Sequence, residues 1–310
     1  MSYNQLWKVV LVSCVIIRAV SSTFGMDDRI ECGRRKLKTV FLIRNGNDAI
    51  VGHWPWHATI FHLKGKELEY ACGGSILDQN TILTAAHCVT RVSGVIHRRH
   101  IYVQLGRIEL KQEQDYIQSH DVQEIFVHPK FSQKSIAHDI ALVKLASNIT
   151  FTKYVQPVCI WNLNDQENPI IGKNGTIVGF GLTENDTVSD RLKNALIGIV
   201  DPLQCIESDR GAFGHLLTSE MICGKGQNGV SACNGDSGGG MFFEINGKWF
   251  VRGLVSFTPG RENNSHLCDG NKNTVFTDVA KYEGWITQYV DLRLLHDPND
   301  LIVEHDERLK

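Results

Sequence analysis

The sequence predicts an all-β fold that ends in one helix. Short apolar runs rich in Val, Ile and Phe are separated by Gly, Asn, Asp and Pro, a spacing typical of β-barrels or β-sandwiches. These runs are residues 57–61, 101–105, 122–127, 140–145, 195–200 and 249–257. From residue 279 the apolar residues follow a different spacing, typical of a helix, at Val279, Tyr282, Ile286 and Tyr289. With 310 residues, 42% of them hydrophobic, the chain is long enough to bury a sizeable core.

Residues 1–22 have the pattern of a secretory signal peptide. Lys8 precedes an apolar run from Val9 to Ile17, and small residues follow up to Ser22. A membrane anchor is the alternative, but a spanning helix needs about 20 apolar residues and Arg18 interrupts this run. We therefore expect a secreted, extracellular protein without a membrane anchor.

Two further segments lie outside the β pattern. Residues 23–42 are polar and basic, and are either a solvated linker or a propeptide with processing sites. Cys32 favours a propeptide, because a disulfide would keep this light chain attached after cleavage. Residues 291–310 form a charged, irregular tail that we expect to be partly disordered.

The cysteines agree with secretion. Cys14 would leave with the signal peptide, and eight cysteines remain, an even set for which spacing alone allows about 105 pairings. Four Asn-X-Ser/Thr sequons in polar stretches are expected glycan sites on surface loops. They begin at Asn148, Asn174, Asn185 and Asn263.

Charge gives no sign of a nucleic acid partner. The net charge of −2 becomes −4 once Lys8 and Arg18 are removed with the signal peptide, leaving 30 basic against 34 acidic residues. We expect no nucleic acid binding and no binding to an anionic membrane.

Ser237 lies in a stretch of small residues, 231–240, that reads Ser-Ala-Cys-Asn-Gly-Asp-Ser-Gly-Gly-Gly. Glycines would let the backbone expose the serine hydroxyl and turn its amides toward a substrate. A tight turn without chemistry is the alternative reading. Two other motifs decide between them, since Thr84-Ala-Ala-His87-Cys88 would supply a base and His138-Asp139-Ile-Ala-Leu142 an acid to orient it.

These three motifs, in the order His87, Asp139, Ser237, resemble those of chymotrypsin-like serine proteases, from about Ile43 to Val290. The resemblance implies two antiparallel six-stranded β-barrels with a carboxyl-terminal helix and an active site between the barrels. It also implies that Ser237 is the nucleophile, His87 the general base and Asp139 the group that orients it.

The resemblance extends to supporting groups. Ser256 matches the serine that binds the aspartate, and the amides of Gly235 and Ser237 match the oxyanion donors. The implied disulfides are Cys72–Cys88, Cys205–Cys223, Cys233–Cys268 and Cys32–Cys159.

Activation is implied to need a new amino terminus at Ile43, whose ammonium would pair with Asp236. Leu42 departs from the family, because most relatives have Arg or Lys there. Trypsin-like cleavage therefore cannot make this cut, whereas a chymotrypsin-like activator could. Phe180 and Phe257 replace common tryptophans, and we expect little change from them.

The specificity pocket that the resemblance implies has Ser231 at its base, six residues before Ser237, where trypsin-like relatives place an aspartate. A basic side chain would be desolvated there without gaining a partner. Thr258 and Thr274 match wall positions that are glycine in relatives with open pockets, so small apolar residues should be preferred before the scissile bond. The alternative is that loop differences near Cys268 move Thr274 aside and leave a broader pocket.

We expect no metal or other cofactor. His97 with His100, or His53 with His57, could pair on a metal, but neither pair has a nearby third ligand in the sequence. Arg107 stands where calcium-binding relatives carry a carboxylate, and its charge would repel the ion.

The sequence thus predicts a secreted serine endopeptidase made as a zymogen. Its partners would be protein or peptide substrates, an activating protease and protein inhibitors. A catalytically silent protease-like binding protein or cascade cofactor is the alternative.

Overall fold

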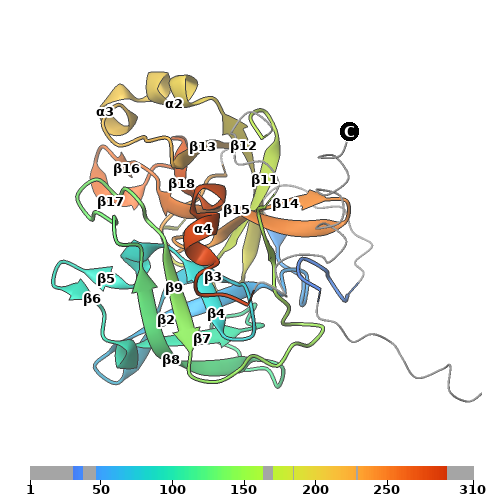
Figure 1. Ribbon diagram of the computed structural model, residues 1–310. Helices are drawn as coiled ribbons and strands as arrows, with labels where there is room; N and C mark the ends of the chain where they lie inside the picture. Colours follow the sequence, from blue (N-terminus) through green and yellow to red (C-terminus); the bar gives the residue numbers. More distant parts are fainter. Residues whose placement is uncertain (1–30, 38–46, 163–169, 184, 228–229, 292–310) are drawn as a thin grey trace, which may run out of the picture. The chain divides into compact units, whose positions relative to one another are not determined.

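The computed structural model describes residues 31–37, 47–162, 170–183, 185–227 and 230–291. In these residues the all-β prediction is confirmed, with two closed six-stranded antiparallel barrels (Figure 1). The expected signal peptide, Leu42, Ile43 and all but the first residue of the expected tail lie outside the described residues. No helix in the described part combines the length and apolar character that crossing a bilayer requires.

The first barrel, cyan to green in Figure 1, closes in the order β2-β3-β4-β9-β8-β7. Its strands are β2 (His57–Lys64), β3 (Glu67–Ile76), β4 (Thr81–Thr84), β7 (Ile101–Leu105), β8 (Gln118–Val127) and β9 (Ala141–Leu145). In β7, Ile101, Val103 and Leu105 are buried while the residues between them are partly exposed, the period of two that a strand imposes. Each such buried side chain stabilises the fold by ~1.5–3 kcal/mol.

The second barrel closes in the order β12-β11-β14-β15-β18-β13, through pairing of β13 with β12. Two short strands are added outside the ring, β1 on β12 and β10 on β15. The strands are β1 (Asn47–Asp48), β10 (Cys159–Ile160), β11 (Asn174–Gly179), β12 (Lys193–Val200), β13 (Met221–Gly226), β14 (Gly240–Ile245), β15 (Lys248–Phe257) and β18 (Thr274–Asp278).

The predicted carboxyl-terminal helix is confirmed as a 3-10 turn, η3 (Val279–Tyr282), followed by α4 (Glu283–Ile286), with Val279 and Ile286 fully buried. Two short helices were not predicted, α2 (Pro202–Ser208) and α3 (Arg210–Phe213). The remaining elements are η1 (Ala86–Cys88), η2 (Arg98–His100) and the hairpins β5 (Thr90–Arg91) with β6 (Gly94–Val95) and β16 (Gly260–Arg261) with β17 (Asn264–Cys268).

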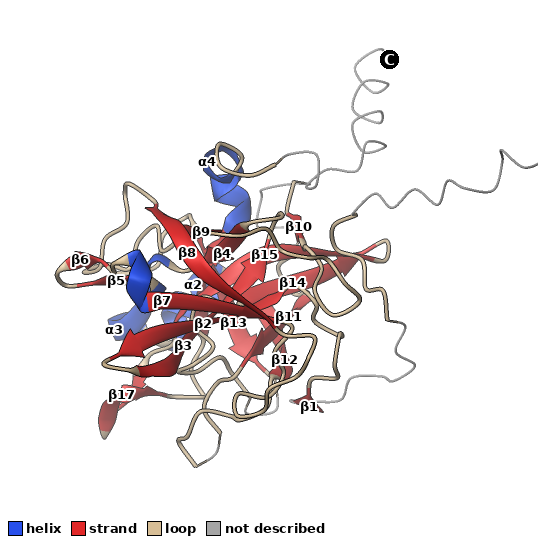
Figure 2. Cartoon of the chain, turned by 90° about the horizontal axis from the view of Figure 1, so that it is seen from below, coloured by secondary structure: helices blue, strands red, loops and turns tan. Residues whose placement is uncertain are grey.

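One apolar cluster takes side chains from both barrels. It joins Leu83 and Leu142 of the first barrel to Phe242 and Leu254 of the second. Figure 2 views the molecule from the side of the first barrel, with the second behind it. The contact between the barrels is therefore a continuous hydrophobic core, which holds the residues at their junction in place.

Four disulfides join Cys72 to Cys88, Cys205 to Cys223, Cys233 to Cys268 and Cys32 to Cys159. These are the pairs that the resemblance implies. The last of them ties the segment 31–37 to the strand β10.

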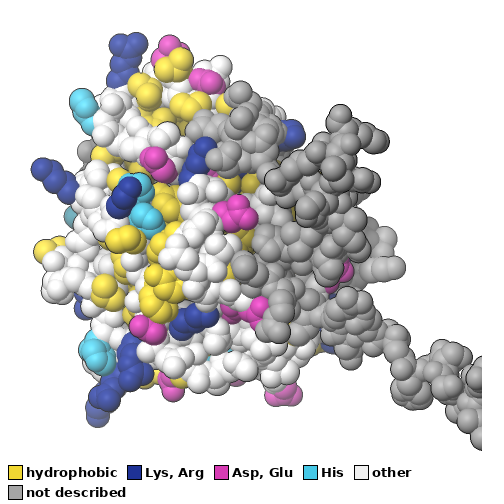
Figure 3. Space-filling view, in the orientation of Figure 1, with side chains coloured by type: hydrophobic (Ala, Val, Ile, Leu, Met, Phe, Trp, Pro, Cys, Tyr) yellow, Lys and Arg dark blue, Asp and Glu magenta, His cyan; other side chains and the backbone are white. Residues whose placement is uncertain are grey.

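The surface carries the four sequon asparagines Asn148, Asn174, Asn185 and Asn263, all exposed. In Figure 3, apolar side chains protrude at the left edge, where Figure 1 places the β5–β6 hairpin. Val92 and Val95 of that hairpin are among the exposed large hydrophobic residues.

Candidate active site

His87 and Asp139 meet at the junction of the barrels. His87 lies in η1, which begins two residues after the end of β4, and Asp139 lies two residues before the start of β9. The Nδ1 atom of His87 is 2.7 Å from Oδ2 of Asp139, and the backbone N–H of His87 donates to Oδ1 at 2.9 Å. Because a carboxylate only accepts hydrogen bonds, Nδ1 carries the proton and Nε2 is left as an acceptor.

The second barrel holds the same aspartate from the other side. Ser256 of β15 donates its hydroxyl to Oδ2 of Asp139 at 2.6 Å, and Thr277 of β18 donates to the backbone carbonyl of Asp139 at 2.8 Å. Asp139 is fully buried and its orientation is fixed by these four hydrogen bonds. Ser256 therefore lies where the sequence comparison expected it.

The electrostatics of His87 suit a base. Burial lowers the pKa of His87, but the charge of Asp139 and its hydrogen bond raise the pKa by more, so the net shift is upward from 6.5. The side chain remains 31% exposed and is accessible from solvent. A group with these properties can take up a proton near neutral pH.

Ser237 is partly exposed on the loop between β13 and β14. Its carbonyl accepts a hydrogen bond from the N–H of Gly73 in β3 at 2.9 Å. The next residue, Gly238, has a φ of 71°, and a Cβ there would collide with Thr84 Oγ1 and lie 2.9 Å from Cys88 Sγ. The serine loop is thus packed against the two residues that flank the His87 segment.

The expected oxyanion donors lie in the same loop. Gly235 has a φ of 95°, a conformation that favours glycine, and its carbonyl accepts a hydrogen bond from the hydroxyl of Tyr70. Within the described residues, the amides of Gly235 and Ser237 donate to no other protein group. Tyr70 was missed in the sequence, which has no pattern around that residue to mark it.

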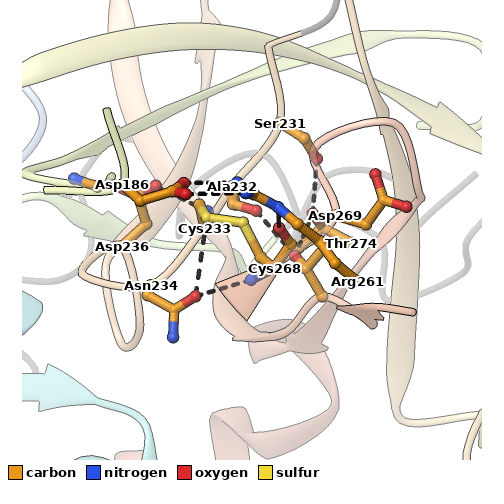
Figure 4. Close-up of a disulfide and its surroundings, with 12 residues drawn as sticks. Asp186, Ser231, Ala232, Cys233, Asn234, Asp236, Arg261, Cys268, Asp269 and Thr274 are labelled. Atoms are coloured by element: carbon orange, nitrogen blue, oxygen red, sulfur yellow. Dashed lines mark hydrogen bonds and ion pairs between the residues drawn. A yellow bond between two sulfur atoms is a disulfide. The ribbon is translucent and has the colours of Figure 1, made fainter. Parts of the chain in front are cut away.

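The three expected pocket residues lie together. Thr274 is fully buried, and its hydroxyl is 2.8 Å from that of Thr258 and 3.0 Å from that of Ser231. Figure 4 shows Ser231 and Thr274 beside the Cys233–Cys268 disulfide. Thr274 therefore stands between the other two residues instead of being moved aside.

Asp236 lies beside a cavity of about 510 Å³, lined among others by Ser231, Gly181, Lys193 and Asn194. Its carboxylate accepts hydrogen bonds from the amides of Gly181 and Cys233, both at 2.9 Å. Burial raises the pKa of Asp236 to about 6, although those two hydrogen bonds lower it. No described Lys, Arg or His forms an ion pair with this carboxylate.

Phe180 and Phe257, the two phenylalanines at positions where relatives commonly have tryptophan, both pack against another aromatic ring. Phe180 is fully buried against Tyr70, with ring centroids 5.3 Å apart, and the ring centroids of Phe257 and Phe213 are 6.4 Å apart.

The histidine pairs considered for a metal have other environments. His53 contacts Arg35, and His57 is buried with its pKa lowered by burial to about 3. His97, which caps η2, and His100, its last residue, are both exposed. A cluster of Cys72, His87 and Cys88 also has ligand atoms close together, but both cysteines form a disulfide and cannot bind a metal as thiolates.

Arg107 occupies the centre of the loop that follows β7. Its buried guanidinium donates to the carbonyls of Glu109, Leu110 and Gln112, each at 2.9 Å, and to the carboxylate of Glu113. The guanidinium of Arg107 thus supplies the positive charge that these carbonyl and carboxylate oxygens would otherwise offer a site for.

We predict that calcium has no effect on the thermal stability of this protein. Adding Ca²⁺ or a chelator should leave the Tm unchanged, whereas Arg107→Ala should lower it by about 5–10 °C, because three carbonyls lose a charged donor worth roughly 3 kcal/mol in total. Differential scanning calorimetry measures both effects. Arg191→Ala, which removes an exposed arginine near the same loop, is the control. A rise in Tm with Ca²⁺ in the unaltered chain would contradict this account.

Comparison with known proteins now identifies the class. A family model described as Trypsin matches residues 43–286. Chymotrypsin-C of Bos taurus is 35% identical over 256 residues, which cover 80% of this chain and 88% of that protein. Chymotrypsin-like elastase family member 1 of Canis lupus familiaris is 34% identical, over 79% of this chain and 91% of its own. Clotting factor C of Tachypleus tridentatus is 32% identical, but the match covers only 26% of that protein.

The chain therefore belongs to the trypsin family of serine proteases.

Proposed function

We propose that this chain is a secreted serine endopeptidase, made as a zymogen, that cleaves after small apolar residues. The observation that carries the proposal is the hydrogen-bonded set of His87, Asp139 and Ser256, together with the packing of the Ser237 loop against Thr84 and Cys88 on either side of His87. The relatives named chymotrypsin-C and chymotrypsin-like elastase support hydrolysis of peptide bonds as the reaction.

In the proposed mechanism, the hydroxyl oxygen of Ser237 attacks the substrate carbonyl carbon while Nε2 of His87 takes the hydroxyl proton. Asp139 holds the tautomer that leaves Nε2 unprotonated and stabilises the imidazolium that forms. His87 then gives its proton to the leaving amine, and an acyl-enzyme on Ser237 results. Water completes the cycle by the same proton transfers in reverse order.

The free amides of Gly235 and Ser237 would bind the oxygen on which negative charge develops. Such donors act only when they point at that oxygen, and losing one typically costs ~3 kcal/mol of barrier. The positive φ of Gly235 allows the amide to turn toward the site without a Cβ in the way.

The proposed preference for Ala or Val before the scissile bond rests on the hydroxyl chain Thr258–Thr274–Ser231. Two branched side chains occupy space that an aromatic ring would need. The pocket base offers a neutral hydroxyl, so a basic side chain would lose water without gaining an anion.

Secretion is supported by the four disulfides, which persist in oxidising compartments, and by the expected signal peptide at residues 1–22. The exposed sequon asparagines would carry glycans. Cys32–Cys159 would hold the light chain, residues 23–42, on the protease domain, residues 43–290, after activation.

Activation is proposed to insert the amino terminus of Ile43 beside Asp236. Strand β1 supports this, because Asn47 and Asp48 pair with Asn194 and Lys193, which line the cavity that Asp236 borders. Ile43 is four residues before Asn47, and four residues reach about 13 Å when extended, a short path into this cavity. An ammonium there would pair with a buried carboxylate that otherwise has no cation.

We predict that Leu42→Arg converts the chain into one that trypsin activates. Trypsin cuts after Arg, so the variant should start at Ile43 after treatment, whereas the unaltered chain should stay inactive under the same treatment. Amino-terminal sequencing and hydrolysis of a peptide substrate provide the measurement. Both chains should carry Lys38→Ala, so that a cut after Lys38 cannot confuse the result. Full activity of the unaltered chain after the same treatment, or a Leu42→Arg chain that starts at Ile43 and stays inactive, would reject this site.

We predict that Asp236 destabilises the uncleaved chain as the pH rises. Its pKa is about 6 in the folded chain against an ordinary 3.8, so the folded state holds the proton more tightly. The stability from this group is present below pH 4 and is lost as the pH rises through 6, a loss of roughly 3 kcal/mol for two pKa units. In Asp236→Asn, the change in unfolding free energy between pH 4 and pH 8 should shrink accordingly in urea titrations.

Asp209→Asn is the matched control for that titration. Asp209 is partly exposed, and its hydrogen bond to Lys272 lowers its pKa, so its contribution has the opposite sign. If the unfolding free energy of Asp236→Asn kept the pH dependence of the unaltered protein, the carboxylate of Asp236 would have to be paired with a cation in the uncleaved chain.

Labelling with a fluorophosphonate probe tests the proposed activity against the alternative of a silent, protease-like binding protein. The processed protein should be labelled, and Ser237→Ala should not be. If the processed protein remained unlabelled, the chain would be a binding protein or cascade cofactor.

A further inference from the structure

The segment 31–37 lies against the second barrel and is fixed there by its backbone. The N–H of Gly33 donates to the carbonyl of Pro157 at 2.8 Å, and the N–H of Trp249 donates to the carbonyl of Gly33 at 3.0 Å. Gly33 has a φ of 69°, and a Cβ there would lie 2.8 Å from the nitrogen of Trp249. The Cys32–Cys159 disulfide is beside these contacts.

Arg34 and Arg35 have opposite environments within this segment. Arg34 is exposed and donates to the carbonyl of Gly247 at 2.9 Å. The guanidinium carbon of Arg35 is 4.4 Å from the ring centre of Trp54 and 4.3 Å from that of Trp249. Nη1 of Arg35 is 2.9 Å from Nε2 of His53. Both tryptophans and His53 are buried, and together they form a cage around the guanidinium of Arg35.

The chemistry of this cage selects a guanidinium. The rings of Trp54 and Trp249 are nearly perpendicular, with an interplanar angle of 81°. A planar cation between them can lie parallel to one ring face and still donate to His53 in its own plane, which a lysine ammonium cannot do. Burial and the charge of Arg35 lower the pKa of His53 to about 4, so at neutral pH its Nε2 accepts the hydrogen bond. Burial lowers the pKa of Arg35 to about 10, with Glu244 opposing the shift, and Arg35 remains charged.

We propose that Trp54, Trp249 and His53 form a guanidinium-binding site whose resident ligand is Arg35. The light chain is then bound to the protease domain by this site as well as by its disulfide. Within the run Arg34-Arg35-Lys36, the side chain of Arg35 holds the light chain on the protease domain. The peptide bond after Arg35 is therefore shielded from processing proteases. This inference does not depend on whether the chain hydrolyses peptides.

The test uses the full chain with Cys32→Ser and Cys159→Ser, and with residues 39–42 replaced by the recognition sequence of a specific protease. After cleavage, size-exclusion chromatography measures how fast the light chain leaves. With Arg35→Ala we expect release about 30-fold faster, since a desolvated cation–π contact is worth roughly 2 kcal/mol. Arg35→Lys should also release faster, whereas Arg34→Ala should change the rate less than about threefold.

A ligand competition distinguishes a guanidinium site from general charge attraction. Butylguanidine, which has a guanidinium, should accelerate release, and butylamine, an ammonium of the same charge and chain length, should not. Equal release rates for Arg35→Ala and the unaltered segment, or equal effects of the two cations, would overturn the proposal.

A second measurement applies if the chain without the disulfide fails to fold. In the uncut, disulfide-bonded chain, Arg35→Ala should alter the tryptophan emission spectrum and Arg34→Ala should not. Unchanged emission in Arg35→Ala would equally overturn the proposal.

Discussion

Asp139→Asn should lower kcat by about 10⁴-fold in the processed enzyme, the magnitude known for this substitution in the type member of the family. Oδ1 can remain a carbonyl oxygen and keep the hydrogen bond from the N–H of His87. The amide nitrogen then takes the place of Oδ2 and donates to Nδ1 of His87, which forces the proton onto Nε2. A protonated Nε2 cannot accept the proton of Ser237. Steady-state hydrolysis of a peptide ester or amide measures the loss.

Ser256→Ala is the graded comparison for this prediction. It removes one of the hydrogen bonds to Oδ2 but leaves the carboxylate and the tautomer of His87 intact. We expect a loss of about tenfold, in line with one hydrogen bond to a charged group. Asp139→Asn with more than a tenth of the original kcat would contradict the role of Asp139 in orienting His87.

Opening the pocket walls should change the substrate preference by about 100-fold. In Thr258→Gly with Thr274→Gly, the ratio of kcat/KM for Phe over Ala before the scissile bond should rise by that factor, because the two lost side chains make room for the ring. Arg and Lys should remain poor substrates, since Ser231 still provides no anion. A peptide library assayed with the activated enzyme measures the ratios.

The paired change Thr258→Ser with Thr274→Ser separates volume from hydrogen bonding. It keeps the hydroxyl chain to Ser231 and removes only the two methyl groups. Its preference should lie between those of the original and the glycine variant. Dominant cleavage after Phe, Arg or Lys by the unaltered enzyme would refute a pocket closed by the threonines.

The fold was predictable where apolar residues repeat with a clear period. All six apolar runs became strands, and the spacing of Val279 and Ile286 marked the last helix. The helix α2 was missed because only Cys205 of its seven residues is buried, so its sequence has no apolar stripe at helical spacing. Its start does have a local signal, since Asp201 caps the amide of Leu203 and Pro202 occupies the first turn.

The candidate catalytic and pocket residues could be named from the sequence because short motifs carry their chemistry, and their roles stay predictions. Tyr70, which no motif marks, could not be named. The structure brings His87, Asp139 and Ser256 into direct contact and places Thr274 between Ser231 and Thr258. The cage of Arg35 was not predictable, because it unites residues from the two ends of the chain, and in the sequence Arg35 reads as part of a processing site. Such contacts depend on tertiary packing, which no local pattern encodes.

The hydrogen bonds of Asp139 have a consequence for the lifetime of the enzyme. His87 and Asp139 belong to the first barrel, whereas Ser256 and Thr277 belong to the second. A small separation of the barrels in mild denaturant would break these bonds while each barrel keeps its own strands. Loss of activity should then precede loss of the far-UV circular dichroism signal. The contact between the two barrels, and not the stability of either barrel, would limit how long activity lasts.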